Sequence, residues 1–275
     1  MNTGNEKTPE QIIAEARGTY APIKWFVGFS GGNDSLTVTH WMMENMPGAV
    51  AFHANTGIGV EKTREFVRDT CRDRGWPLIE IRAKEDCGQD YDQLVLERGF
   101  PGPAHHKKMY ARLKERCVEK LVRDTKKHRM DKVAIVTGIR HDESQVRAGY
   151  AGREINRTGA QVWQNPLYWW GKGDFHRYLK ANDLQTNPVS DMLGMSGECL
   201  CGAFAHKGEK EMIRLVDPGV VDRIESLERQ CLAKGMTWGW EQQPPDGGWN
   251  PDQGMMDFEA EQPMCVGCGK KGGVY

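Results

Sequence analysis

The sequence lacks the features that mark several large classes of protein. Its first residues, MNTGNEKTPEQ, contain no apolar stretch typical of a signal peptide, and no apolar run reaches the roughly 20 residues of a membrane span. Neither sign of charge is in excess, because 37 lysines and arginines meet 38 acidic residues, which excludes a uniformly basic nucleic-acid binder. We therefore expect a cytoplasmic protein with no membrane partner.

What is present is a chain long enough for one large domain and rich in cysteine. Its 275 residues are 39% hydrophobic and 27% charged, so a packed core is feasible and extensive disorder is not expected. In a chain expected to be cytoplasmic, eight cysteines favour metal binding or redox chemistry over structural disulfides.

Apolar, β-rich runs alternate with helical segments along the first two thirds of the chain. Glu61 to Gly75 is an amphipathic helix ended by glycine, and a long helical segment runs from about His106 to His128. Strands that alternate with helices form parallel βαβ units, so we predict an α/β fold with a doubly wound parallel sheet. The predicted strands are Ile23 to Phe29, Ala49 to Asn55, Pro77 to Ala83, Lys132 to Ile139 and Gln161 to Leu167.

The chain changes character near residue 190. Gly194 to Phe204 is rich in glycine and cysteine, a helix is predicted from about Glu209 to Lys234, and the last 35 residues show little periodicity. We therefore divide the chain into a sheet domain, 1–190, and a cysteine-rich helical and irregular C-terminal extension, 191–275.

A glycine-rich loop follows the first predicted strand and precedes a helix. Its residues are Ser30, Gly31, Gly32, Asn33, Asp34 and Ser35. The glycines let the backbone approach an anion closely, the helix start adds N–H groups and a positive dipole end, and the serines add hydroxyl donors. The loop has neither the lysine of a Walker A loop nor GxGxxG spacing. We interpret it as a phosphate or pyrophosphate site, with an ordinary βα turn as the alternative.

The segment SGGNDS resembles the signature of the PP-loop ATP pyrophosphatases, and the chain resembles more narrowly the phosphoadenylylsulfate (PAPS) reductase family. Three further segments carry the narrower resemblance in the family's order: HANTGIGVEKTREFV (53–67), TGIRHDESQVR (137–147) and NPLYWWGKGDFHRYLKANDLQTNP (165–188). The resemblance implies a five-stranded parallel sheet, with an adenine nucleotide (ATP or PAPS) across the carboxyl ends of its strands.

The resemblance also implies which residues contact the nucleotide. Besides the loop from Ser30 to Ser35, these are Gly57, Gly138, Arg140, Glu143, Ser144 and Arg147. Asp34, Lys114, Arg140 and Arg147 are the implied catalytic residues. Arginine forks match phosphate or sulfate oxygens, and an arginine–glutamate salt bridge at the sheet edge is the alternative. Cys117, near Lys114, is interpreted as a buried free cysteine rather than a ligand.

Four cysteines form two close pairs outside the predicted sheet. They are Cys199 and Cys201, and Cys265 and Cys268. Two pairs suffice for one four-thiolate site, either a [4Fe–4S] cluster or a structural zinc, with a redox disulfide or unliganded thiols as the alternatives. The family resemblance favours the cluster. The chain ends CVGCGKKGGVY and departs from the E-C-G-x-H type of motif that carries the nucleophilic cysteine of the family's reductases.

Charge is unevenly distributed. Residues 105–129 hold ten lysines and arginines against three acidic residues, a local charge of +7, and residues 241–275 carry −4. A solvated helix face explains the basic stretch as well as a nucleic-acid partner, DNA or tRNA, does.

Three functions follow as hypotheses from the loop, the cysteines and the resemblance. The first is reduction of a sulfonucleotide with a thiol reductant. The second is an ATP-dependent sulfurtransferase that modifies DNA or tRNA, with an iron–sulfur cluster and with Mg²⁺ accompanying ATP. The third is a nucleotide-binding module without catalysis.

Overall fold

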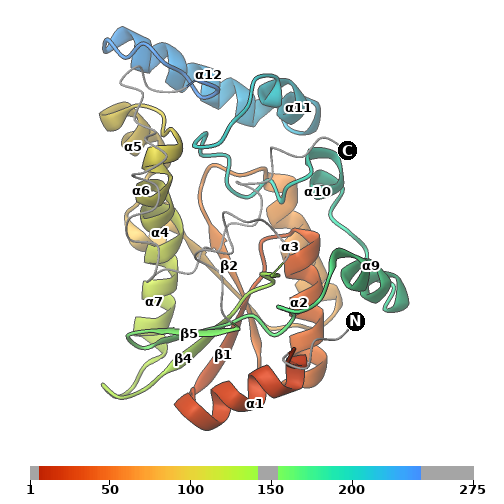
Figure 1. The fold of residues 1–275 in the computed structure, drawn as a ribbon. Helices are drawn as coiled ribbons and strands as arrows, with labels where there is room; N and C mark the ends of the chain where they lie inside the picture. Colours follow the sequence, from red (N-terminus) through yellow and green to blue (C-terminus); the bar gives the residue numbers. More distant parts are fainter. Residues whose placement is uncertain (1–5, 142–153, 243–275) are drawn as a thin grey trace.

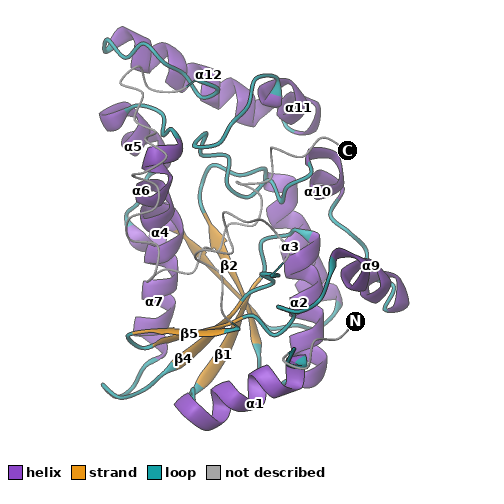
Figure 2. Ribbon diagram, in the orientation of Figure 1, coloured by secondary structure: helices purple, strands orange, loops and turns teal. Residues whose placement is uncertain are grey.

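The fold is built around one twisted sheet, with helices on both faces (Figure 2). The computed structural model describes residues 6–141 and 154–242. The sheet has six strands in the order β3-β2-β1-β4-β6-β5. Their bounds are β1 (Lys24–Gly28), β2 (Val50–Asn55), β3 (Leu78–Arg82), β4 (Val133–Val136), β5 (Ile155–Thr158) and β6 (Gln161–Gln164).

The five predicted strands are confirmed, and they pair in parallel. The structure adds β5, which runs antiparallel to β6 at the edge of the sheet. The β5 sequence, INRT, is short, polar and partly exposed, so it has no buried apolar pattern to reveal it. Gly159, at φ +60°, closes the turn between the two strands.

Helices follow most of the predicted segments, with two differences. The segment 106–128 is interrupted by a π-helical turn, η2, and the segment 209–234 breaks at Pro218, where Asp217 accepts hydrogen bonds from the N–H groups of Gly219 and Val220. The helices are α1 (Pro9–Tyr20), α2 (Asn33–Asn45), α3 (Glu61–Asp73), α4 (Ala83–Cys87), α5 (Tyr91–Arg98), η1 (Pro103–His105), α6 (His106–Tyr110), η2 (Ala111–Glu115), α7 (Arg116–Thr125), α9 (Lys172–Ala181), α10 (Pro188–Leu193), α11 (Glu209–Val216) and α12 (Pro218–Ala233).

Side chains alternate between two cores along β1. Trp25 and Val27 pack with α1, α2 and α9 on one face, whereas Phe26 packs with α5 and α7 on the other. The helices α11 and α12 join the same hydrophobic cluster as Phe26, and they lie at the end of the molecule opposite α1 (Figure 1). The division at residue 190 stays a prediction. No helix in the described ranges has the length and apolar character that a membrane span requires.

Candidate nucleotide and sulfur site

The phosphate loop, Ser30 to Ser35, lies between the carboxyl end of β1 and the first turn of α2. Gly31 has φ +81°, and a Cβ atom there would lie 2.8 Å from Cγ2 of Thr63, so only glycine fits this turn. Asn187 fixes the loop from outside, because its Nδ2 donates to the carbonyl of Gly31 at 3.1 Å and to Oγ1 of Thr63 at 3.1 Å.

The two serines of the loop bond to each other and to its backbone. Ser35 Oγ donates to the carbonyl of Gly32 at 2.8 Å and accepts from the N–H of Ser30 at 3.2 Å. Gly32 is the N-cap residue of α2 and has no side chain to bond the N–H groups of the first turn. These N–H groups therefore remain to bind an anion at the positive end of the helix.

The segment after β4 contacts the start of α2 closely. A Cβ atom on Gly138 would lie 2.6 Å from the carbonyl oxygen of Asp34, which only glycine avoids. Arg140 is 5% exposed and places its Nη2 3.4 Å from Oδ2 of Asp34, with its guanidinium 5.1 Å from the ring centre of Phe175. The structure thus brings Gly138, Arg140 and Asp34 together at one end of the phosphate loop.

Several predicted residues lie outside the described part of the chain. They are Glu143, Ser144, Arg147, Cys265 and Cys268. Their roles stay predictions.

Gly57 lies in the turn after β2, on the carboxyl edge of the sheet. Its φ is +78°, and open space surrounds the position where a Cβ atom would be. Asn55 Oδ1 accepts from the N–H of Gly57 at 3.0 Å, and Arg223 of α12 donates to the carbonyl of Gly57 at 2.5 Å while it pairs with Asp92. The C-terminal helix α12 therefore helps to hold this turn.

An ion pair on β3 supports the same turn. Glu80 accepts from Nε and Nη2 of Arg68, both at 2.8 Å, and from Nδ2 of Asn55 at 2.7 Å. The hydrogen bonds from Arg68, helped by the one from Asn55, lower the pKa of Glu80 to about 2 although partial burial opposes this.

We expect this lowered pKa to make stability depend on pH. Ionised Glu80 stabilises the fold above its unfolded pKa of roughly 4.3, and the contribution disappears as the pH falls toward 2. In urea unfolding at a series of pH values, Glu80→Gln should therefore flatten the acid limb of stability. Glu85→Gln, at a side chain 52% exposed, is the matched control. Equal acid limbs for Glu80→Gln and the natural chain would contradict the assignment.

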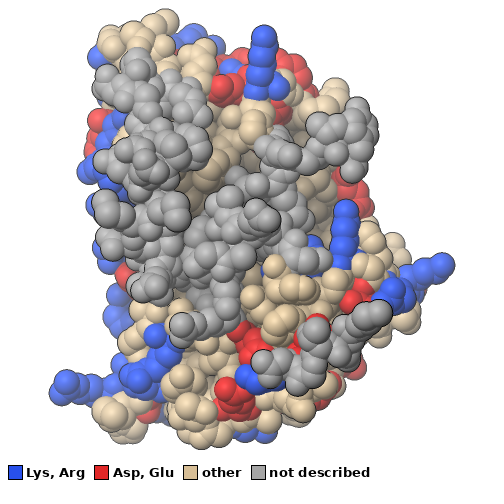
Figure 3. Space-filling model, viewed as in Figure 1, with Lys and Arg blue, Asp and Glu red and all other residues tan. Residues whose placement is uncertain are grey.

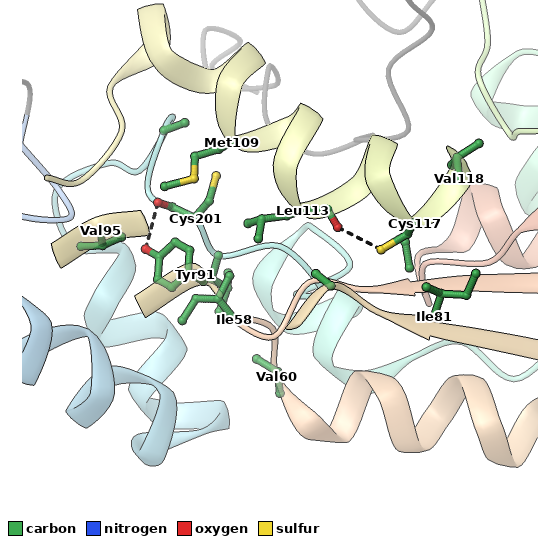
Figure 4. Close-up of a cluster of buried hydrophobic side chains, with 14 of the residues drawn as sticks. Ile58, Val60, Ile81, Tyr91, Val95, Met109, Leu113, Cys117, Val118 and Cys201 are labelled. Carbon is green, nitrogen blue, oxygen red and sulfur yellow. Dashed lines mark hydrogen bonds between the residues drawn. The ribbon is translucent and has the colours of Figure 1, made fainter. Parts of the chain in front are cut away.

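Lys114 lies in the π-helical turn between α6 and α7 and is only 6% exposed. A π turn rotates side chains relative to a regular helix and occurs often at functional sites. Cys117, one turn on, is fully buried, and its Sγ donates to the carbonyl of Leu113 at 3.4 Å (Figure 4). Burial raises the pKa of the Cys117 thiol, as expected of a packing cysteine.

The cysteine-bearing loop, residues 194–204, packs directly on the phosphate loop. A Cβ atom on Gly32 would lie 3.5 Å from Cβ of Ser196. Thr63 Oγ1 donates to the carbonyl of Ser196 at 2.7 Å, and the N–H of Val60 donates to the carbonyl of Gly197 at 2.9 Å. The two loops are far apart in the sequence, so no sequence pattern indicates that they are in contact, and the sequence analysis did not predict it.

A buried charged cluster anchors the same loop. Glu198, 2% exposed, places its Oε2 3.2 Å from Nε2 of His53 and 3.3 Å from Nε of Arg64. Its Oε1 accepts from the N–H of Thr56 at 2.8 Å, and a Cβ atom on Gly59 would lie 2.4 Å from its carbonyl oxygen. The anchor thus spans the ends of β2 and α3.

The ionisation of the cluster follows from its contacts. Burial alone lowers the pKa of His53, but the charge and hydrogen bond of Glu198 outweigh it and raise that pKa. Burial alone raises the pKa of Glu198, but His53, and after it Arg64, lowers that pKa. Sequence reasoning missed Glu198, whose one signal is its place immediately before Cys199.

Cys199 and Cys201 line one small pocket of about 30 Å³. Cys199 is half-buried and Cys201 is buried. The carbonyl of Cys201 accepts from the hydroxyl of Tyr91 at 3.1 Å (Figure 4), and the indole N–H of Trp240 donates to the carbonyl of Leu200 at 2.7 Å. Among the described residues, no group of three or more His, Cys, Asp and Glu side chains is arranged to hold a metal ion.

A phosphate loop at the carboxyl edge of a parallel sheet, with glycines at each close approach, defines a nucleotide-binding α/β protein. The model of the phosphoadenosine phosphosulfate reductase domain matches residues 24–192. The chain belongs to this family, and thereby to the PP-loop superfamily.

Individual relatives are distant. The chain is 27% identical over 168 residues to the tRNA(Ile)-lysidine synthase of Pseudomonas syringae pv. tomato, covering 58% of this chain and 36% of that protein. It is 27% identical over 157 residues to the adenosine 5′-phosphosulfate reductase of Burkholderia cepacia, covering 57% of this chain and 60% of that one. The chain thus spans about a third and three fifths of the length of these relatives.

The fold agrees with a solved structure of the family. The crystal structure of PAPS reductase from Candida auris, a phosphate complex, matches with a TM-score of 0.50 and 16% identity, covering 70% of this chain and 88% of that one. This likeness confirms the α/β fold.

Proposed function

We propose that the chain is an enzyme of sulfur metabolism that binds an adenine nucleotide on the phosphate loop and carries out chemistry on sulfur beside it. One observation carries the proposal: the loop with Cys199 and Cys201 packs on Gly32 of the phosphate loop and is anchored there by Glu198. Anion-binding N–H groups and thiols are thereby held on neighbouring segments. Both reactions considered below need a nucleotide phosphate and a sulfur nucleophile close together.

The residues around the loop take distinct roles in this proposal. The N–H groups at the start of α2 and the hydroxyls of Ser30 and Ser35 bind phosphate oxygens. Arg140, with Lys114 and Arg147, offsets negative charge that develops on the phosphate as a bond to it breaks. Asp34 holds the Arg140 guanidinium in place through their ion pair.

The first reaction is reduction of a sulfonucleotide. A thiolate attacks the sulfur atom of bound PAPS or of its analogue without the 3′-phosphate. A sulfur–sulfur bond forms, the bond from sulfur to the phosphate oxygen breaks, and its electron pair leaves on the nucleotide. A second thiol then attacks the cysteine sulfur, so that sulfite is released and a disulfide forms. A thiol reductant supplies the two electrons.

The second reaction uses ATP to activate a nucleic acid. An acceptor oxygen attacks the α-phosphate, and pyrophosphate leaves together with Mg²⁺. A hydrosulfide ion from a sulfide donor then attacks the activated carbon, a carbon–sulfur bond forms, and AMP leaves with the electron pair of the broken carbon–oxygen bond. The uneven distribution of charge favours this second reaction, because the basic stretch at residues 105–129 includes α6 and α7. The sequence similarity to a tRNA(Ile)-lysidine synthase supports a tRNA acceptor in particular.

A [4Fe–4S] cluster remains part of the proposal, with zinc as the alternative. Cys199 and Cys201, the two described members of the proposed ligand set, both line one small pocket. Cys265 and Cys268 would complete the set. A bound cluster would supply a Lewis-acidic or electron-transferring centre.

Product analysis tests the proposal. Purified protein is incubated with PAPS or its 3′-dephospho analogue plus thioredoxin, and separately with ATP, Mg²⁺ and tRNA or DNA. The first reaction predicts sulfite and the nucleotide monophosphate, whereas the second predicts pyrophosphate release that requires the nucleic acid. A protein that binds nucleotide without turning over either mixture would contradict both reactions and support the non-catalytic module.

A further inference from the structure

A basic pocket lies far from the phosphate loop, at the opposite edge of the sheet. Its volume is about 530 Å³, and it opens between the carboxyl end of α7 and the turn that joins β5 to β6. Since β4 and β6 begin at this edge, the pocket is at the amino ends of these strands, whereas the phosphate loop is at the carboxyl end of β1. The nucleotide proposed above therefore does not occupy it.

The pocket is lined by cations in excess. Arg123, Lys126, Lys127 and Arg129 face one acid, Glu119. In the described ranges, no salt bridge involves Lys126, Lys127 or Arg129. Four cations against one acid give the lining of the pocket a net positive charge.

The turn that carries these cations is preformed. Oδ2 of Asp131 accepts from the N–H groups of Lys127 and His128, both at 2.8 Å. These two bonds fix the backbone before any ligand binds, which lowers the entropy cost of ordering it.

The lining also suits ribose. Thr158 and Gln161 add neutral side chains, and His128 adds an imidazole, to the hydrogen-bonding groups beside the cations. Proteins that bind double-stranded RNA contact its phosphates and its 2′-hydroxyl groups, which need this combination of charged and neutral partners.

The basic surface is too long for a small anion. Lysines and arginines gather along the edge of the molecule beside α6 and α7 (Figure 3, left), which together with η2 run from His106 to Thr125. About 20 helical residues extend roughly 30 Å, the reach of several successive phosphates. The pocket is the end of this strip.

We infer that the basic pocket docks the backbone of a double-stranded RNA stem. This inference rests on the second reaction proposed above, in which tRNA is the acceptor. The pocket would hold a stem of the RNA while another part of the same RNA reaches the phosphate loop. Recognition is of the phosphate and ribose backbone and not of base sequence.

Charge reversal at the pocket tests the inference. The probe is a fluorescein-labelled 20-base-pair RNA duplex, and binding is followed by fluorescence anisotropy at several salt concentrations. The variant Lys126→Glu/Lys127→Glu/Arg129→Glu should bind about tenfold or more weakly than the natural chain. It should also reduce the slope of log affinity against log salt by about 2 to 3, one unit for each lost phosphate contact.

The control carries the same change of charge on other surfaces, Lys172→Glu/Lys180→Glu/Arg229→Glu, at exposed residues of α9 and α12. It should bind RNA as the natural chain does. Equal weakening by both variants, tighter binding of a DNA duplex of the same length, or binding of phosphatidylserine vesicles but not RNA would each overturn the inference. Nucleotide binding to both variants should stay unchanged; its absence from the natural chain would instead defeat the proposed function.

Discussion

Glu198→Ala is expected to lower the free energy of unfolding by about 3–5 kcal/mol, because Nε2 of His53 and Nε of Arg64 lose their carboxylate partner in a buried site and Arg64 keeps only Glu61 as an ion-pair partner. It also removes the bond from the N–H of Thr56. The loop 194–204 should then leave the phosphate loop, and Cys201, which is buried in the natural chain, should react faster with a thiol reagent.

Urea unfolding and the rate of thiol modification measure the two effects. Glu65→Ala, an exposed carboxylate on α3, is the control and should change stability by less than about 0.5 kcal/mol. Glu198→Gln separates charge from shape, since it keeps the side-chain oxygen that accepts from Thr56. If Glu198→Ala were as stable as the control, with thiols no more reactive, the buried cluster would not be the anchor of the loop.

Asp34→Ala is expected to reduce kcat/KM for the nucleotide by about a hundredfold or more. Asp34 positions Arg140, and loss of one charge-stabilising group in a site typically costs that much. Stability is expected to fall as well, because the acidic side chain in the first turn of α2 contributes about 0.3–1 kcal/mol and buried Arg140 loses an ion-pair partner.

Turnover kinetics and urea unfolding of the same preparations check this prediction. Glu44→Ala, an exposed acid at the other end of α2, is the matched control and should keep full activity. Asp34→Asn tests whether the charge matters, because it keeps the shape of the side chain. Full activity of Asp34→Ala would show that the phosphate loop is not where the nucleotide reacts.

The centre of the sheet could be predicted because β2 and β4 are buried on both faces. All four residues of β4 are buried, and an apolar run of that kind stands out in the sequence. Strand β5 could not, since its half-exposed INRT gains its structure from pairing with β6. The break of the 106–128 helix at η2 could not be predicted either, because the π turn contains no proline or glycine.

The candidate site divides in the same way. The phosphate loop is one continuous segment, so its glycines, its serines and its place between β1 and α2 could all be predicted from the sequence. The contact between Gly32 and Ser196 and the cluster around Glu198 depend on how α3 and the 194–204 loop meet, which only the folded chain decides. The loop that carries Cys199 and Cys201 thus lies beside the phosphate loop, which the sequence did not predict.

We propose that an adenine nucleotide binds with its phosphates on the loop from Ser30 to Ser35, next to the cysteine-bearing loop. The most direct measurement is a crystal structure of the protein with a bound adenine nucleotide. We predict phosphate oxygens within hydrogen-bonding distance of the N–H groups at the start of α2, with Arg140 in contact with the same phosphates. A nucleotide bound elsewhere, with Ser35 and Arg140 making no contact to it, would contradict this placement.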